Sequence, residues 1–110
     1  MDVVLHVPDP DRVARALGNA ENLLADESID VDVVALVANG DAVRALRAGG
    51  EFADDLTVAL DRGISVRACA NSMAGRDLDA DELLPGVEIV PSAMGELARL
   101  QAEGYAYVRP

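Results

Sequence analysis

The chain has 110 residues and a mass of 11.5 kDa, which is enough for one α/β domain and too little for two hydrophobic cores. Its 20 acidic and 9 basic residues give a formal net charge of −11, so we expect no nucleic-acid partner. Hydrophobic residues make up 51% of the chain, which predicts a folded domain. No apolar run approaches the roughly 20 residues that span a bilayer, so we expect a cytoplasmic protein with no membrane partner.

All the basic residues are arginines, and the chain contains no lysine. Dense short carboxylates keep a protein surface hydrated and self-repelling at salt concentrations that screen charge. We therefore interpret the composition as that of a halophilic protein. An ordinary acidic cytosolic protein is the alternative.

The first third of the chain has the pattern of a strand followed by a helix. Residues 3–7 form a short apolar run that ends at Pro8, which predicts a buried strand. Asp9 is then expected to cap a helix with Pro10 at its first position. Apolar residues recur at helical spacing along it, at Val13, Leu17, Ala20 and Leu24. Gly18 interrupts this helix, and we expect it to permit a close approach to the sheet.

The second strand is predicted at residues 31–38, which are almost all apolar and rich in valine. This pattern is typical of a central strand covered on both faces. Asp41 is expected to cap a helix that runs to Arg47. A further helix is predicted around Leu56, followed by Gly63 at its carboxyl end.

In the third strand, residues 64–70, apolar side chains alternate with Ser65, Arg67 and Cys69. A short helix is predicted at residues 79–84, a strand at 87–90, a helix from Ser92 to Ala102 and a strand at 105–109. Alternating strands and helices predict a three-layer α/β/α sandwich with a five-stranded, mainly parallel sheet. We expect residues 1–110 to form one domain.

Ligands of open parallel sheets bind beyond the carboxyl ends of the strands, so chemistry is expected at that edge. The polar residues that the sequence places there are His6, Asn39, Gly40, Cys69, Asn71, Ser72 and Ser92.

Cys69 is the candidate for covalent chemistry. Backbone N–H groups at a strand end that leads into a helix would stabilise its thiolate, and Arg67 on the same face would partly offset the acidic surroundings. The alternative is a buried cysteine that packs as a small hydrophobe. As the single cysteine, it forms no disulfide within the chain.

Other kinds of site have less support in the sequence. His6 is the single histidine, and it is either a proton shuttle near Cys69 or a core residue. One histidine and one cysteine are too few ligands for a zinc site, so we expect no metal site. We also expect no cofactor. Neither familiar phosphate-binding loop is present. Asn19 and Asn22, three residues apart on the first helix, either face a pocket or a subunit interface or are simply exposed.

Several segments in order resemble the DsrE/DsrF-like (YchN-like) sulfur-relay superfamily over essentially the whole chain. They are His6-Val7, Asn19-Ala20-Glu21-Asn22-Leu23-Leu24, Val37-Ala38-Asn39-Gly40, Ala68-Cys69-Ala70-Asn71-Ser72-Met73 and Gly104-Tyr105-Ala106-Tyr107-Val108. The fourth segment is similar to the A-C-x-N-S-L motif of a branch of small single-domain members, with Met73 in place of leucine.

This resemblance implies a parallel five-stranded sheet, assembly into trimers or hexamers, and a cysteine that carries sulfur as a persulfide. Cys69 matches the sulfur-accepting position, with Asn71 and Ser72 lining its turn, while His6, Asn39 and Gly40 would line the pocket. Because no second cysteine can receive the sulfur, a relay requires a donor or acceptor protein.

We therefore expect a sulfur carrier that resembles a sulfurtransferase. A non-catalytic oligomeric module that binds a small ligand is the alternative, and a cysteine hydrolase ranks third. A Cys69 sulfur closed off from solvent would favour the second of these.

Overall fold

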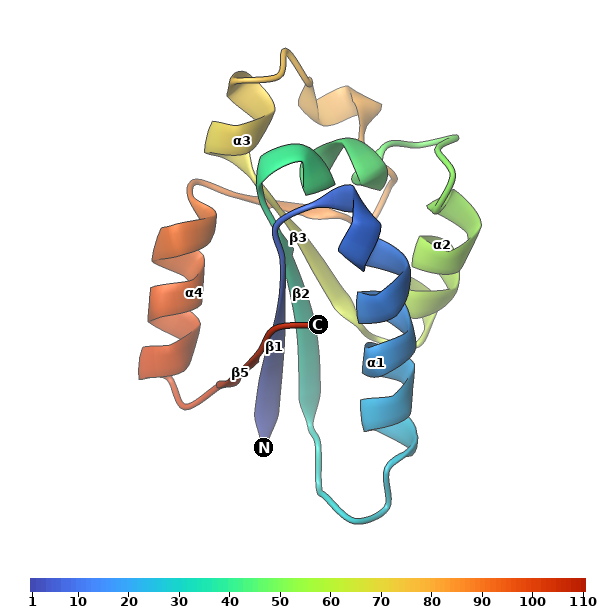
Figure 1. Cartoon of the computed structure of the whole chain (residues 1–110), viewed down its shortest axis with the longest axis vertical. Coiled ribbons are helices and arrows are strands. Elements are labelled where there is room, and N and C mark those ends of the chain that lie inside the picture. The colour runs from blue at the N-terminus through green and yellow to red at the C-terminus, as the bar shows by residue number, and fades with distance from the viewer.

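The computed structural model describes all 110 residues as an open parallel sheet between two layers of helices (Figure 1). The strands are β1 (Asp2–Val7), β2 (Val33–Ala38), β3 (Ser65–Cys69), β4 (Glu88–Val90) and β5 (Ala106–Val108). The α-helices are α1 (Val13–Ala25), α2 (Ala53–Asp61), α3 (Ala70–Ala74) and α4 (Ala93–Ala102). Short 3₁₀ helices lie at η1 (Pro10–Arg12), η2 (Gly40–Leu46) and η3 (Ala80–Glu82).

All neighbouring strands are parallel, in the order β4-β3-β2-β1-β5. The predicted α/β sandwich is therefore confirmed, and β2 lies inside the sheet as its apolar sequence indicated. Helices α1 and α2 cover one face, and α4 covers the opposite face (Figure 1). None of the helices is long and apolar enough to cross a membrane.

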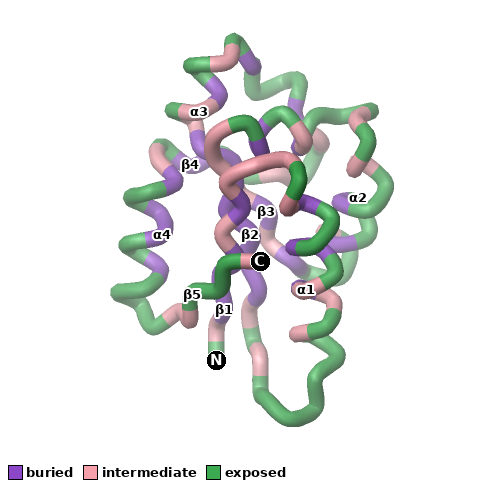
Figure 2. The backbone as a smooth tube through the Cα atoms, viewed as in Figure 1, coloured by how far each residue is buried: buried purple, intermediate pink, exposed green.

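The core is one cluster of 28 buried residues, contributed by the strands and by the inner faces of the helices (Figure 2). Leu5, Leu56, Ile64 and Leu100 are the largest side chains that are fully enclosed. Leu5 and Leu56 belong to the α1 and α2 side, whereas Leu100 comes from α4. Both faces of the sheet are thus packed against apolar helix surfaces, as a parallel sheet requires.

Two local expectations about helices are wrong. A Cβ atom built on Gly18 would meet nothing within 4 Å, so this glycine does not serve a close approach to the sheet. Asp41 does not cap a helix, because the N-cap position of η2 is Asn39 and the turn is of the 3₁₀ type. The cap predicted at Ser92 is confirmed, since its hydroxyl accepts a hydrogen bond from the N–H of Gly95 at 3.3 Å.

Candidate functional site

Cys69 is the last residue of β3 and precedes α3 directly. In the sheet it lies in register with Val90, at the carboxyl end of the neighbouring strand β4. Its side chain is only 4% exposed and belongs to the core cluster. The residue is therefore at the expected edge of the sheet, but its sulfur is covered.

The sulfur of Cys69 is surrounded by hydrogen-bond donors. The backbone N–H of Ala93, the first residue of α4, donates to Sγ at 3.3 Å. The hydroxyl of Ser72 and the backbone N–H groups of Ser72 and Asn71 also donate to it. The sulfur thus lies at the amino-terminal end of the ten-residue helix α4, where the helix dipole favours negative charge.

These donors decide the ionisation of the thiol. Burial alone raises the pKa of Cys69, because a charged sulfur loses its hydration. The hydrogen bonds from the Ser72 hydroxyl and from the backbone of Ala93, Ser72 and Asn71 outweigh burial, so the pKa lies below the usual value for cysteine. The structure therefore combines a covered sulfur with a stabilised thiolate, a state that favours nucleophilic chemistry.

Ser72 is oriented by Gly40. The backbone N–H of Gly40 donates to Oγ of Ser72 at 2.8 Å, which leaves the hydroxyl proton free to point at Cys69. Gly40 has φ +57°, and a Cβ atom on it would lie 2.8 Å from the carbonyl oxygen of Pro8. Only glycine fits this position without displacing the chain.

Arg76 holds the turn on the other side of Ser72. Its Nε donates to Oδ1 of Asp41 at 2.7 Å, and its Nη1 donates to the carbonyl oxygen of Ser72 at 3.1 Å. This contact keeps the pKa of Asp41 below its usual range. Asp41, expected as a helix cap, instead fastens η2 to the segment that follows α3.

His6 belongs to a separate polar group. Its Nε2 donates to Oδ1 of Asn39 at 2.9 Å, and its Nδ1 lies 2.7 Å from the hydroxyl of Tyr107. In the tautomer that carries its proton on Nε2, Nδ1 is the acceptor for the hydroxyl of Tyr107. Tyr107 was not expected in this group. The sequence placed it on the last strand, but it did not show that this strand pairs with β1.

The His6 group and Cys69 share one face of the sheet without touching. His6 is in register with Val37, and Val37 with Arg67, so alternation places Asn39 and Cys69 on this same face. Because β1 and β3 are two strand spacings apart, roughly 10 Å separates their backbones. His6 therefore does not serve Cys69 as a directly bonded base in this arrangement.

Arg67 is engaged by α4 rather than by Cys69. Its Nη1 donates to Oε2 of Glu96 at 2.9 Å. Burial raises the pKa of Glu96, but hydrogen bonds from Arg99 and Arg67 outweigh this and keep it below its usual value. The expected electrostatic support of the thiolate by Arg67 is thus largely neutralised by a carboxylate.

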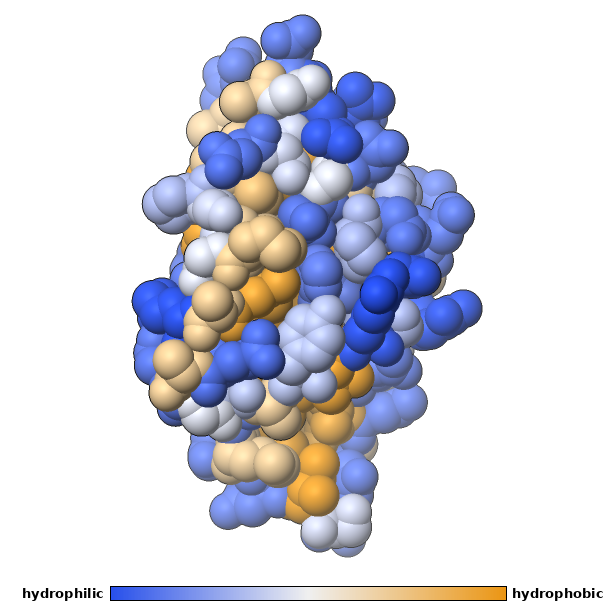
Figure 3. All heavy atoms as spheres, turned by 60° about the vertical axis from the view of Figure 1, so that its left-hand side comes forward, coloured by the Kyte–Doolittle hydropathy of each residue, from blue (hydrophilic) through white to orange (hydrophobic).

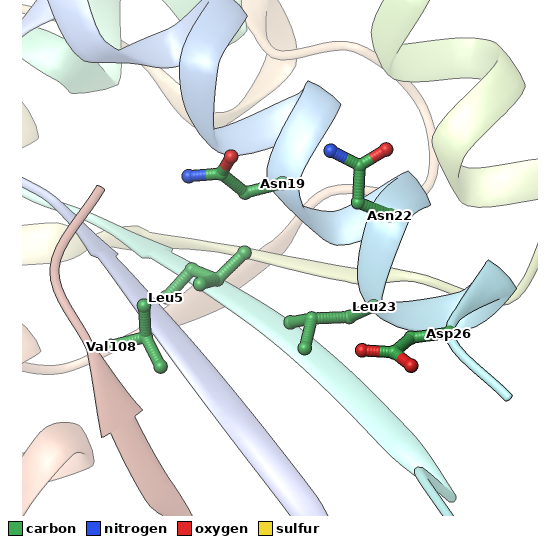
Figure 4. A pocket seen from close by; sticks show the side chains of 6 residues that line it. All are labelled: Leu5, Asn19, Asn22, Leu23, Asp26 and Val108. Carbon is green, nitrogen blue, oxygen red and sulfur yellow. The ribbon is translucent and has the colours of Figure 1, made fainter. Parts of the chain in front are cut away.

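Asn19 and Asn22 line a groove of about 260 Å³ between α1 and the edge of the sheet (Figure 4). Leu5, Leu23, Asp26 and Val108 complete its lining. Leu5 comes from β1 and Val108 from β5, so the groove opens beside the short edge strand. Neither Cys69 nor the His6 group contributes to it.

No group of three or more His, Cys, Asp or Glu side chains is arranged to hold a metal ion. The site at the sheet edge brings together one thiol, the Ser72 hydroxyl and backbone donors.

The sequence matches the model of the DsrE/DsrF-like family over residues 1–110. The chain belongs to the DsrE/DsrF-like family. It is similar to the solved structure of MTH1491 from Methanobacterium thermoautotrophicum, a protein of unknown function, with 35% identity and a TM-score of 0.92. That match covers 99% of this chain and 98% of the other. No curated protein matches the chain.

Two more distant structures share the DsrE-like fold. The ychN protein of E. coli is 22% identical with a TM-score of 0.84, covering 100% of this chain and 99% of that one. BT1422 of Bacteroides thetaiotaomicron, a conserved protein of unknown function, is 13% identical with a TM-score of 0.72, covering 99% and 94%. Membership of the DsrE-like family suggests a role related to sulfur relay.

Proposed function

We propose that this DsrE-like protein is a sulfur carrier that holds sulfane sulfur on Cys69. The observation that carries the proposal is the contact between Sγ and the N–H of Ala93, which places the sulfur at the start of α4. Together with the Ser72 hydroxyl, this contact favours the thiolate, which is the nucleophile in sulfur exchange.

The exchange is redox-neutral. The Cys69 thiolate attacks the terminal sulfur of a donor persulfide, so that a new S–S bond forms while the S–S bond of the donor breaks and its thiolate leaves. Attack by an acceptor thiolate on the terminal sulfur of the Cys69 persulfide then regenerates Cys69. Neither step requires a cofactor, because electrons and atoms balance within the two exchanging partners.

The other predicted residues fit two roles in this scheme. Asn71 and Ser72 donate hydrogen bonds to the sulfur, and Gly40 orients Ser72. His6 and Asn39 hold each other at the same edge of the sheet, and we propose that they contact the incoming donor or acceptor. Tyr107 joins this second group through His6.

A single cysteine requires transfer between chains, and the surface supports association with other copies. Figure 3 brings the α4 side forward and shows a band of apolar side chains running down this face. Met94 on α4 and Tyr107 on β5 are 56% and 40% exposed. We propose that copies assemble through this side, as a trimer or hexamer, in the reducing cytoplasm.

Sulfur loading tests the proposal directly. Purified protein is incubated with polysulfide or thiosulfate and its intact mass is measured, with Cys69→Ser as the matched control. We expect the wild-type chain to gain one sulfur atom that dithiothreitol removes, and the variant to gain none. Sulfur gain by the variant, or none by the wild type, would overturn the carrier role.

One observation favours a second function, a binding or assembly module without catalysis. Cys69 is 4% exposed, as a packing residue would be, and the groove beside α1 offers open volume elsewhere. In that case wild type and Cys69→Ser would assemble equally, neither would load sulfur, and Asn19→Leu would block ligand binding. Sulfur loading on Cys69 would rule out a purely structural role.

A further inference from the structure

An enclosed ion pair joins α4 to β3 beside the sulfur site. Arg67 and Glu96 have side chains only 13% and 9% exposed, and Nη1 of Arg67 lies 2.9 Å from Oε2 of Glu96. Glu96 is the one buried residue of the chain that is polar or charged. Because both side chains are enclosed, the pair does not belong to the solvated surface charges of this acidic protein.

The same two elements meet a second time at the sulfur. Arg67 lies two residues before Cys69 on β3, and Glu96 lies three residues after Ala93 on α4. Arg67 and Cys69 share the face of β3 that lies towards α4, because every second strand residue lies on the same face. Ala93 and Glu96 share the face of α4 that lies towards β3, because helical residues three or four apart lie on the same face. The ion pair and the sulfur contact are thus two adjacent attachment points between one strand and one helix.

Apolar contacts restrict where α4 sits along the sheet less sharply than directional bonds do. Ala93, Leu97 and Leu100 are its buried apolar residues, and hydrophobic packing has no preferred direction. An enclosed ion pair contributes little net stability, since removing two charges from water costs about as much as their attraction returns. Its hydrogen-bond geometry is directional, however, and permits one register.

We propose that Arg67 and Glu96 are positioning residues that hold the first N–H of α4 on the sulfur of Cys69. The inference rests on the proposed role of Cys69, and it assigns this pair the task of maintaining the thiolate. Neither side chain touches the sulfur, so both act through the placement of Ala93.

The alternative is that Arg67 stabilises the thiolate directly by its charge, and the two effects can be separated. Removing both charges together, in Arg67→Met/Glu96→Gln, leaves the local net charge unchanged. The charged neighbours of the pair, Glu88 at 4.0 Å from Arg67 and Arg99 bonded to Glu96, remain in place. Direct electrostatics then predicts that the Ala93 amide stays protected whatever the thiol pKa does, whereas loss of positioning predicts a raised pKa together with faster exchange of that amide.

The measurement is the pH dependence of thiolate ultraviolet absorbance, with Cys69→Ser subtracted to remove the tyrosine signal. We expect the double variant to lower the thiolate-to-thiol ratio at neutral pH by about three- to tenfold, because one hydrogen bond to the sulfur weakens. Amide hydrogen exchange at Ala93 should accelerate with it. Arg99→Met is the matched control, since Arg99 bonds the same carboxylate from within α4 and does not link it to β3.

A double variant that titrates like the wild type and protects the Ala93 amide equally would overturn the inference. Should the double variant fail to fold, Glu96→Asp makes the same test, because it keeps every charge but shortens the reach of the carboxylate. We expect it to raise the pKa of Cys69, and an unchanged pKa would overturn the inference. Titration requires no sulfur donor, so failure of the carrier function would show separately, as an intact thiolate that loads no sulfur.

Discussion

The backbone N–H of Gly40 donates to Oγ of Ser72 at 2.8 Å, which ties the start of η2 to helix α3 beside the sulfur. This hydrogen bond uses Oγ as an acceptor and leaves its proton available for a second bond. The hydroxyl of Ser72 donates that second bond to Cys69. A backbone group at the start of η2 thus influences the thiol at the end of β3 through one side chain.

Ser72→Ala is expected to raise the pKa of Cys69 by up to about one unit, because the thiolate loses a hydrogen-bond donor. Titration of thiolate absorbance measures the change. Ser28→Ala is the control, since Ser28 bonds Asp26 at the end of α1 and is exposed. An unchanged pKa in Ser72→Ala would show that the hydroxyl does not support the thiolate.

Gly40→Ala is expected to destabilise the fold by about 2–4 kcal/mol, through its positive φ and through the clash of a Cβ with Pro8. Gly49→Ala separates the two causes. Gly49 has φ +72° but open space around its missing Cβ, so it should cost only about 1 kcal/mol. Urea unfolding of both variants checks the difference, and equal losses would mean that the close approach to Pro8 is unimportant.

The lowered pKa of Cys69 makes stability depend on pH. A thiol with a depressed pKa in the folded state contributes stability above its unfolded pKa, and this contribution is lost as pH falls through the folded pKa. The free energy of unfolding of the wild type, relative to Cys69→Ala, should therefore increase as pH rises from neutrality towards 9. Urea unfolding across this range tests it, and a pH-independent difference would contradict the thiolate assignment.

Tyr107→Phe is expected to leave the titration of Cys69 unchanged, because the His6 group lies two strands away from the sulfur. Removal of the hydroxyl at 2.7 Å from Nδ1 of His6 should instead change the imidazole signals in NMR spectra. If the residue helps to bind the donor, sulfur loading slows while the thiol pKa remains the same. A shifted thiol pKa would show that the two polar groups are coupled.

Salt should stabilise this protein if its acidic surface reflects a halophilic origin. At a net charge of −11 the folded chain repels itself, and ions screen that repulsion. We expect the thermal midpoint to rise between dilute buffer and molar KCl, with sucrose as an uncharged control. A midpoint that does not respond to KCl would favour the ordinary acidic protein.

The sequence was sufficient for the architecture because its signals are local and consistent. Each signal can be recognised within one short segment of the chain. Examples are the valine-rich run of β2, the capping residue Ser92 and the alternating pattern around Arg67. Strand order depends on contacts between distant segments, so the pairing of β5 with β1 could not be predicted. The contact between Tyr107 and His6, which follows from this pairing, could not be predicted either.

The edge position of Cys69 was predictable, but its surroundings were not. A strand that ends before a helix start indicates backbone donors, and the structure contains them in α3. One further donor, the N–H of Ala93, lies 24 residues further along the chain. Arg67 lies on the same face of the sheet as Cys69, as predicted, but it binds Glu96. This partner could not be predicted, because only the packing of α4 on the sheet brings Glu96 close to Arg67.

The start of α4 lies against the sulfur of Cys69 and also supplies a hydrogen bond that lowers the pKa of the thiol. Cys69 is 4% exposed, so any opening that widened the approach to Sγ on this side would also lengthen its contact with the N–H of Ala93. Without that hydrogen bond a smaller fraction of the thiol is ionised at neutral pH, while each thiolate that remains is more basic and a stronger nucleophile. Solvent access to the sulfur and ionisation of the sulfur therefore both depend on the position of one helix end.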